Sequence, residues 1–374
     1  MSEIIKFFKK ELMFTVSLIL AILSLFITKP DTRLLQSIDY KTLCILFMLL
    51  SVLDGFKHEG LFDPVIKAAK KIRSIFALSV FLIFAVFISS AFVTNDVSLI
   101  IFVPLTILLF KEGNKEKYIL PVITMENIAA VRGSLITPFG SPQNLYLFSK
   151  SGIDITSFLK MMFPLFAFSA VLLFIFIICL YRKDLREEIN YAEMADEAND
   201  SKKKFLYLSL FIIVVLTIVT RTIYWPLITV AVALILFIFD RKVFRRVDYV
   251  LLLTFLCFFI FSSSIANNEL IGTYLNSVVR GNEYWWSIGL SQIISNVPAS
   301  IVLWPFTSSL KALIYGLDSA GLITVIGSLA SVINMRLYTN DYPGKSVDFM
   351  MVFMKISIIF FILIQPFQLY LLSI

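Results

Sequence analysis

The sequence predicts an all-α protein that crosses the membrane many times and is built as an inverted repeat. Of its 374 residues, 59% are hydrophobic and only 16% are charged, and the mean hydropathy is +0.88. Apolar runs recur from end to end, and about twenty helical residues span the roughly 30 Å hydrocarbon core of a bilayer. A pattern of polar, helix-breaking residues also occurs twice, in the two halves of the chain.

The duplicated pattern has two parts. Thr94-Asn95 and Ser295-Asn296 are each followed nine residues later by a proline, and the segments 136–141 and 323–328 both read Ile-Thr-x-x-Gly-Ser. Duplicated, interrupted helices at membrane depth are typical of secondary transporters, whose sites lie where the breaks meet. Small polar residues also mediate ordinary helix packing in membranes, which is the alternative for any one motif alone.

The apolar runs are expected to be helices, because backbone groups in lipid must pair within the protein and the alternation of a β-barrel is absent. The single histidine, His58, excludes a multi-histidine metal site and a Ser-His-Asp hydrolase. The three cysteines lie far apart in apolar stretches and indicate neither a disulfide nor a metal set. With no nucleophile–base motif or phosphate loop, we expect neither an enzyme nor a cofactor.

The first half, residues 1–181, is predicted to be the first repeat. Its hairpin is expected to be re-entrant, with the tip at Thr94-Asn95-Asp96. Its broken helix is expected to be interrupted at 137–144, because Pro and Gly occur there within an apolar run. The expected elements are helices at about 12–28 and 39–54, a basic amphipathic surface segment at about 59–73, the hairpin at 75–110, the broken helix at about 118–150 and a helix at 157–181.

The second half, residues 205–374, is predicted to repeat this order with one extra helix at 205–220 that inverts the copy. Its hairpin tip is expected at 295–297 and its helix break at 324–331. Residues 182–204, thirteen of which are charged, are predicted to form a solvated cytoplasmic linker; a docking site for a partner is the alternative. The remaining expected elements are helices at 225–240 and 247–265, the hairpin at 284–310, the broken helix at about 314–335 and a final helix at 346–372.

The distribution of Lys and Arg predicts the topology. With the N-terminus inside and the C-terminus outside, 23 of the 33 basic residues fall on the cytoplasmic side and eight fall outside. The Lys-rich segments 57–73 and 111–117 lie on the same side only if residues 75–110 turn back within the membrane. The net charge of +7 therefore reflects a multi-pass protein of the cytoplasmic membrane, with the bilayer and not nucleic acid as its partner.

The breaks provide the predicted site. The second arm of each hairpin begins with unpaired N–H groups and the positive end of a helix dipole, which attracts an anion, whereas the first arm ends in free carbonyl groups, which favour a cation. No metal is expected beyond a transported Na⁺. The predicted substrate contacts are Thr94, Asn95, Thr137, Gly140, Ser141, Asn144, Ser295, Asn296, Thr324 and Ser328, and the predicted coupling-ion contacts are Asn95, Asp96, Glu126, Gly140, Asn296 and Gly327.

Ionisable residues inside the membrane are functional candidates, because their burial is costly. Arg132 is predicted as a counter-charge, either to an anionic substrate or to a buried carboxylate; a static internal ion pair is the alternative. Asp96 or Glu126 is predicted to carry a coupling proton. Glu126 and Arg132 are six residues apart and do not share a helix face, which disfavours a pair between them. Asp318 is expected nearer the outer face.

Three stretches of these motifs resemble the ion transporter superfamily, which includes citrate and dicarboxylate carriers, arsenite permeases and D-type sodium/proton antiporters. They are residues 94–104, residues 126–144, which end in Gly-Ser-Pro-Gln-Asn, and residues 295–298; residues 316–330 also resemble the second half of arsenite permeases. The resemblance implies an elevator-like or rocking carrier, often a homodimer, coupled to Na⁺ or H⁺. It also implies that residues 94–96 and 295–297 occupy the hairpin tips, where members of the family have Ser-Asn-Thr-like residues that contact the cation and the substrate.

The sequence thus predicts an ion-coupled secondary transporter that carries a small anion, a carboxylate or an oxyanion, by alternating access. A sodium/proton antiporter on the same scaffold is the first alternative. An anion channel is an alternative of a different class, because broken helices also build selectivity filters.

Overall fold

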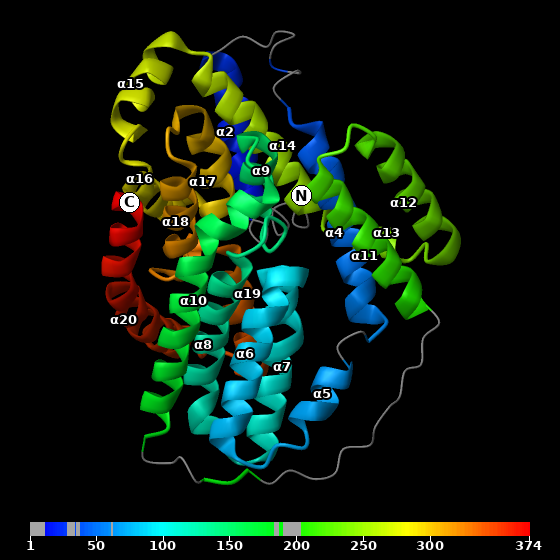
Figure 1. Cartoon of the computed structure of the whole chain (residues 1–374), viewed down its shortest axis with the longest axis vertical. Coiled ribbons are helices and arrows are strands. Elements are labelled where there is room, and N and C mark those ends of the chain that lie inside the picture. Colours follow the sequence, from blue (N-terminus) through cyan, green and yellow to red (C-terminus); the bar gives the residue numbers. More distant parts are fainter. Residues whose placement is uncertain (1–11, 28–33, 35–37, 61–62, 183–186, 190–202) are drawn as a thin grey trace.

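The computed structural model describes residues 12–27, 34, 38–60, 63–182, 187–189 and 203–374, and within these ranges every element of three or more residues is a helix (Figure 1). Five helices are long and apolar enough to cross a membrane: α6, α10, α11, α14 and α20. The N-terminal Lys6, Lys9 and Lys10 and most of the predicted linker lie outside the described residues.

The described helices form two series in the same order, which confirms the predicted all-α inverted repeat. The first series is α2 (Leu12–Ile27), α4 (Tyr40–His58), α5 (Asp63–Ala69), α6 (Ile75–Val93), α7 (Asn95–Glu112), η1 (Glu116–Tyr118), α8 (Ile119–Ser134), α9 (Pro142–Ser151) and α10 (Ile155–Leu180).

The extra helix α11 (Lys203–Thr220) precedes the second series. That series is α12 (Trp225–Phe239), α13 (Val243–Arg246), α14 (Tyr249–Ala266), α15 (Glu269–Val279), α16 (Glu283–Ile294), α17 (Asn296–Leu303), η2 (Trp304–Phe306), α18 (Leu310–Ala320), η3 (Val325–Gly327), α19 (Leu329–Asp341) and α20 (Ser346–Ser373). The residue bounds of the two repeats, 1–181 and 205–374, stay a prediction.

Both hairpins reverse at a single residue. Thr94 joins α6 to α7 with φ 74° and Ser295 joins α16 to α17 with φ 69°. A positive φ is uncommon for residues other than glycine and persists only where the surroundings hold it. The two hairpins therefore share the same unusual turn within the two predicted tips.

The packing follows the inverted repeat. In each series the first arm of the hairpin packs on the first half of the broken helix: α6 on α8, and α16 on α18. The second arm packs crosswise on the second half of the other broken helix: α7 on α19, and α17 on α9. Likewise α2 packs on α14 and α12 on α4. Figure 1 shows the α6–α7 hairpin in the lower half of the molecule and the α16–α17 hairpin in the upper half.

Helix α8 lies at the centre of this arrangement. It contacts α6, α7, α10, α19 and α20, and it is buried along nearly its whole length, polar residues included. Polar groups on α8 can therefore only face other parts of the protein. This is why the residues that precede the first break become site candidates.

Helix α15 was not predicted. It has eleven residues, is capped by Asn268, whose side chain accepts from the Ile271 N–H, and exposes Leu270 and Tyr274. A search for spans of about twenty apolar residues misses such a short amphipathic helix. It precedes the second hairpin as α5 precedes the first.

The prediction of a wholly solvated linker is wrong for residues 187–189. The Ile75 N–H donates to the Glu187 carbonyl (3.1 Å), the Ile189 N–H donates to the Arg73 carbonyl (2.7 Å), and Ile189 is buried. Lys115 donates to the Glu187 carboxylate and lowers the pKa of that group. This short segment therefore packs on the lower end of the first hairpin.

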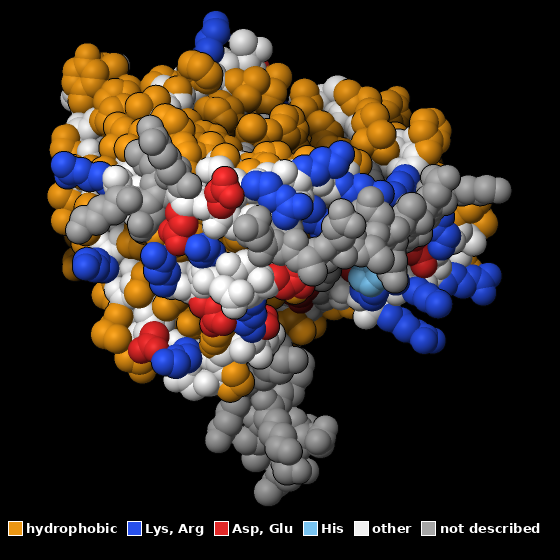
Figure 2. Space-filling view, turned by 90° about the horizontal axis from the view of Figure 1, so that it is seen from below, with side chains coloured by type: hydrophobic (Ala, Val, Ile, Leu, Met, Phe, Trp, Pro, Cys, Tyr) orange, Lys and Arg blue, Asp and Glu red, His pale blue; other side chains and the backbone are white. Residues whose placement is uncertain are grey.

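Figure 2 shows the lower face of the molecule, where basic side chains are more abundant than acidic ones. This agrees with the lower face being cytoplasmic under the positive-inside rule. The orientation of the two termini stays a prediction.

Single cysteines test the orientation. In a background with the three native cysteines changed to serine, we expect Lys71→Cys and Lys115→Cys to react with an impermeant maleimide from one face and Arg280→Cys from the other. The reason is that the hairpin starts, at the beginning of α6, and finishes, at the end of α7, on the same face of the membrane. Labelling of positions 71 and 115 from opposite faces would contradict a re-entrant hairpin.

Candidate functional site

The first break is tied to the first hairpin tip. The Thr137 hydroxyl donates to the Ala91 carbonyl near the end of α6, and the Asn95 N–H at the start of α7 donates to the Gly140 carbonyl (3.1 Å). The Asn95 side chain accepts from the Asp96 N–H (2.9 Å). These bonds satisfy backbone groups that the turn at Thr94 removes from regular helix pairing.

Helix α9 begins at the same place. Ser141 is its N-cap and accepts from the Asn144 N–H (3.4 Å), while the Asn144 side chain donates to the Ser134 carbonyl at the end of α8 (3.3 Å). A Cβ on Gly140 would lie 2.2 Å from the Ser134 carbonyl oxygen. The backbone at Gly140 and the end of α8 are therefore in contact, and only glycine leaves room for this approach.

The second break is tied to the second hairpin by side chains. Asn296 donates to the Leu317 carbonyl (3.4 Å), and Gln292 on α16 donates to the Ala320 carbonyl (3.2 Å) and accepts from the Thr324 hydroxyl (2.7 Å). Gln292 was not predicted as a site residue, since nothing in its local sequence distinguishes it from a packing residue.

The glycine and serine of the second break match those of the first. A Cβ on Gly327 would lie 2.1 Å from the Ala320 carbonyl oxygen, and Ser328, which is buried, occupies the N-cap position of α19. This break begins at Gly321, after α18 ends at Ala320, and so three residues earlier than predicted.

The two broken helices contact one another across the repeats. Asn127 on α8 donates to the Ser331 hydroxyl on α19 (3.0 Å), and Ser331 donates to the Gly321 carbonyl (3.4 Å). A Cβ on Gly321 would lie 3.4 Å from a methyl group of Val131. The structure thus brings together residues of the two halves that are roughly 200 positions apart.

Several buried oxygen atoms near the tips have no hydrogen-bond partner within the described residues. They belong to Asp96 and Gln143 in the first half and to Ser295 and Asn296 in the second. Buried polar atoms are rarely left unpaired, and each such atom requires an explanation. Oxygen atoms without donors suit a cation or a hydrogen-bond donor of a ligand.

Glu126 is fully buried on α8. One carboxyl oxygen accepts from the Thr106 hydroxyl on α7, and the other has no partner within the described residues. An isolated buried carboxylate is strongly disfavoured, whereas a protonated carboxyl group is not. Thr106 was not identified from the sequence, because the contact joins two helices.

Arg132 forms an ion pair with Asp318 and also donates to the Ser319 hydroxyl (3.4 Å). Asp318 is buried in the last turn of α18, and its expected position nearer the outer face stays a prediction. Glu126 does not pair with Arg132, which agrees with the prediction from their spacing of six residues.

Twelve of the fourteen predicted site residues are buried, and Asp96 and Thr324 are half-buried. No group of three His, Cys, Asp or Glu side chains suited to a metal occurs in the part of the chain that the structure describes.

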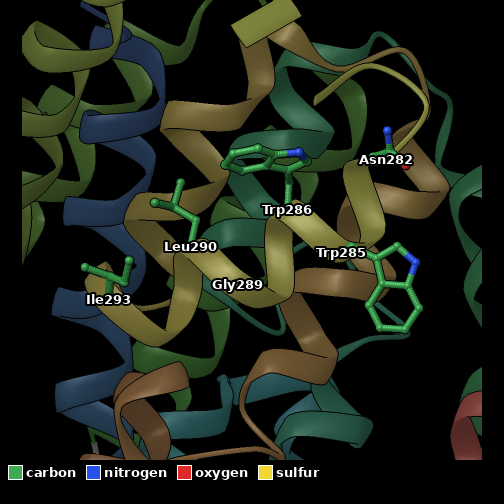
Figure 3. Close-up of a pocket in the computed structure, with 6 residues that line it drawn as sticks. All are labelled: Asn282, Trp285, Trp286, Gly289, Leu290 and Ile293. Atoms are coloured by element: carbon green, nitrogen blue, oxygen red, sulfur yellow. The ribbon is translucent and has the colours of Figure 1, made fainter. Parts of the chain in front are cut away.

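A cavity of about 530 Å³ lies elsewhere, on the outward face of α16 (Figure 3). Its lining includes Trp285, Trp286 and Ile293, which are exposed, and none of the predicted site residues.

Comparison with known proteins gives the family. The model of the citrate transporter family matches residues 4–327. The chain belongs to this family. It is 30% identical to the inner membrane protein YbiR of Escherichia coli (strain K12) over 85% of both chains. It is 31% identical to the uncharacterized transporter MJ0456 of Methanocaldococcus jannaschii over 80% of this chain and 81% of that one.

The fold is similar to that of a solved transporter. The crystal structure of the Alcanivorax borkumensis YdaH transporter, described as having an unusual topology, covers 96% of this chain and 97% of its own, with a TM-score of 0.59 and 14% identity. Family, relatives and fold agree with the predicted ion transporter resemblance. This citrate transporter family member is a multi-pass membrane transport protein and not an enzyme.

The two break glycines provide a test of this geometry. We expect Gly140→Ala and Gly327→Ala each to lower the stability by about 1–3 kcal/mol, because the new methyl group would overlap a backbone carbonyl. Thermal unfolding in detergent measures the loss. Gly289→Ala is the matched control, since a Cβ there has no atom within 4 Å; equal melting temperatures for all three variants would refute the close approach.

Proposed function

We propose that this protein is an ion-coupled secondary transporter that carries a small anion, a carboxylate or an oxyanion, across the cytoplasmic membrane by alternating access. The observation that carries the proposal is the position of four helix N-termini. Helices α7, α9, α17 and α19 all begin at the tips and breaks; each tip is hydrogen-bonded to the broken helix of its own repeat, and the packing of α7 on α19 and of α17 on α9 brings the two repeats together.

These N-termini favour an anion. Each presents the positive end of a helix dipole, which favours an anion without a basic side chain, while the Asn95, Asp96 and Asn144 N–H groups are already paired within the protein. Arg132 is the one buried cationic side chain among the described residues, and Asp318 already neutralises it. The family description, citrate transporter, supports a carboxylate as the first substrate to test.

The coupling ion is proposed to be H⁺ or Na⁺ and to bind close to the anion. The unpartnered oxygens of Asp96, Ser295 and Asn296 lie at the hairpin tips, next to the carbonyl ends of α6 and α16. Such oxygen ligands suit Na⁺, whereas the buried carboxyl of Glu126 suits H⁺. Asp96 is able to serve either ion.

The inverted repeat supports alternating access. Because the two hairpins approach the site from opposite faces, exchanging their roles exposes the same site to either side. The antiporter alternative is supported by two acidic residues of the first repeat, the half-buried Asp96 and the buried Glu126. The homodimer and the choice between elevator and rocking motion stay predictions that rest on the family resemblance.

Purified protein in proteoliposomes tests the function. With imposed Na⁺ or H⁺ gradients, we expect saturable uptake of radiolabelled citrate or arsenite. Na⁺/H⁺ exchange without anion uptake would indicate the antiporter, and flux that does not saturate would indicate a channel.

Asn296→Ala is expected to raise the KM of uptake roughly tenfold, because the variant loses about 1.5 kcal/mol of hydrogen bonding to the substrate. Asn282→Ala, an exposed residue outside the site, is the control.

Variants of Glu126 test proton coupling. We expect Glu126→Gln to abolish the response of uptake to an imposed pH gradient, because the amide cannot exchange a proton. Thr106→Val, which removes the hydrogen bond but keeps the carboxyl group, should retain that response. The same measurement on Asp96→Asn separates the two carboxyl groups. Proton-driven uptake that is unchanged in Glu126→Gln would exclude this residue as the proton carrier.

A further inference from the structure

We infer that Asp318 is a positioning residue: with Arg132 it forms a fixed brace between the two repeats, and neither side chain contacts the transported anion. This inference deepens the proposed function, since it states which parts of the site bind the anion and which only hold the site together.

The ion pair joins matched places in the two repeats. Arg132 is the third residue from the end of α8, and Asp318 is the third residue from the end of α18. Both helices are the first half of a broken helix, and both pack on the first arm of their own hairpin. The pair therefore connects the two breaks at the point where each chain leaves its helix.

Burial argues for a permanent pair. The side chains of Arg132 and Asp318 are 0% and 5% exposed. Removing either partner would leave one charge buried without compensation, which is far more costly than keeping the neutral pair. An anion that displaced Asp318 from Arg132 would leave the Asp318 carboxylate uncompensated.

Further hydrogen bonds hold the arginine in place. Arg132 donates to the Ser319 hydroxyl, Gln368 on α20 donates to the same hydroxyl (2.7 Å), and the Tyr284 hydroxyl on α16 donates to the Gln368 side chain (3.1 Å). All of these residues are buried. Residues of four helices, α8, α16, α18 and α20, thus form one hydrogen-bonded network that includes the ion pair.

The arrangement has two consequences for transport. Since the pair is neutral, it adds no net positive charge to the site, and the anion is bound by the helix N-termini. Since the pair ties α8 to α18, the two breaks keep a fixed distance and move as one unit. The opposing view is that Arg132 binds the anion through its Nε–H group, which has no partner within the described residues.

A double-mutant cycle separates the two views. The variants are Arg132→Gln, Asp318→Asn and the double variant R132Q/D318N, with R132M/D318L as a second, apolar double variant. For each, the melting temperature is measured in detergent, and the KM and maximal rate of uptake are measured with radiolabelled citrate, or with arsenite if the wild type takes up arsenite instead.

We expect each single variant to lower the melting temperature by roughly 5 °C or more, because it leaves a buried charge unpaired. At least one double variant should regain most of this loss and keep the KM within about twofold of the wild type. The brace is refuted if the losses of the single variants simply add in both double variants. It is also refuted if the double variants are stable but their KM rises tenfold or more, which would make Arg132 a substrate contact.

Failure of the brace and failure of the proposed function are distinguishable. If the wild type transports neither citrate nor arsenite, the proposed function fails, but the melting temperatures still decide whether the pair couples the repeats. If the wild type transports an anion and the single losses add, only the brace fails.

Discussion

The structure depends on one constraint: a backbone group at membrane depth must find a partner inside the protein. Four helix interruptions, two turns and two breaks, remove such groups from regular helix pairing. The bonds that replace the lost pairs come from the neighbouring interruption, as in Asn95 to Gly140 or Asn296 to Leu317. The interruptions therefore cluster, and the site is a consequence of how their backbone groups are satisfied.

Duplication makes this clustering possible. Because the second arm of each hairpin packs on the broken helix of the other repeat, neither repeat completes the site alone. The halves differ in the groups that make these contacts: the Asn95 main-chain N–H and the Thr137 hydroxyl bond at the first tip, whereas the side chains of Asn296 and Gln292 bond at the second. Similar backbone geometry thus results from different side chains.

Most of the fold could be predicted, and the site only in part. The tips at Thr94 and Ser295 and the break at Gly140 were predictable because polar residues and glycine stand out in apolar sequence. Gln292 and Thr106 were not, because their role arises from partners on other helices. The second break begins at Gly321, three residues before its predicted start. A local pattern identifies interruptions, whereas charge pairing requires the three-dimensional structure.

The charge balance at the site then limits what it can bind. Four helix N-termini and four helix C-termini occur at the tips and breaks, and the one buried cation among the described residues is neutralised by its own carboxylate. Such a site has little net charge of its own, and Asp96 and Glu126 lower that charge further unless they are protonated. An anion entering it is therefore best compensated by a cation or a proton that binds with it. In the proposed function, coupling follows from electrostatics, because an anion and a cation that bind together leave the site closer to neutral than either one alone.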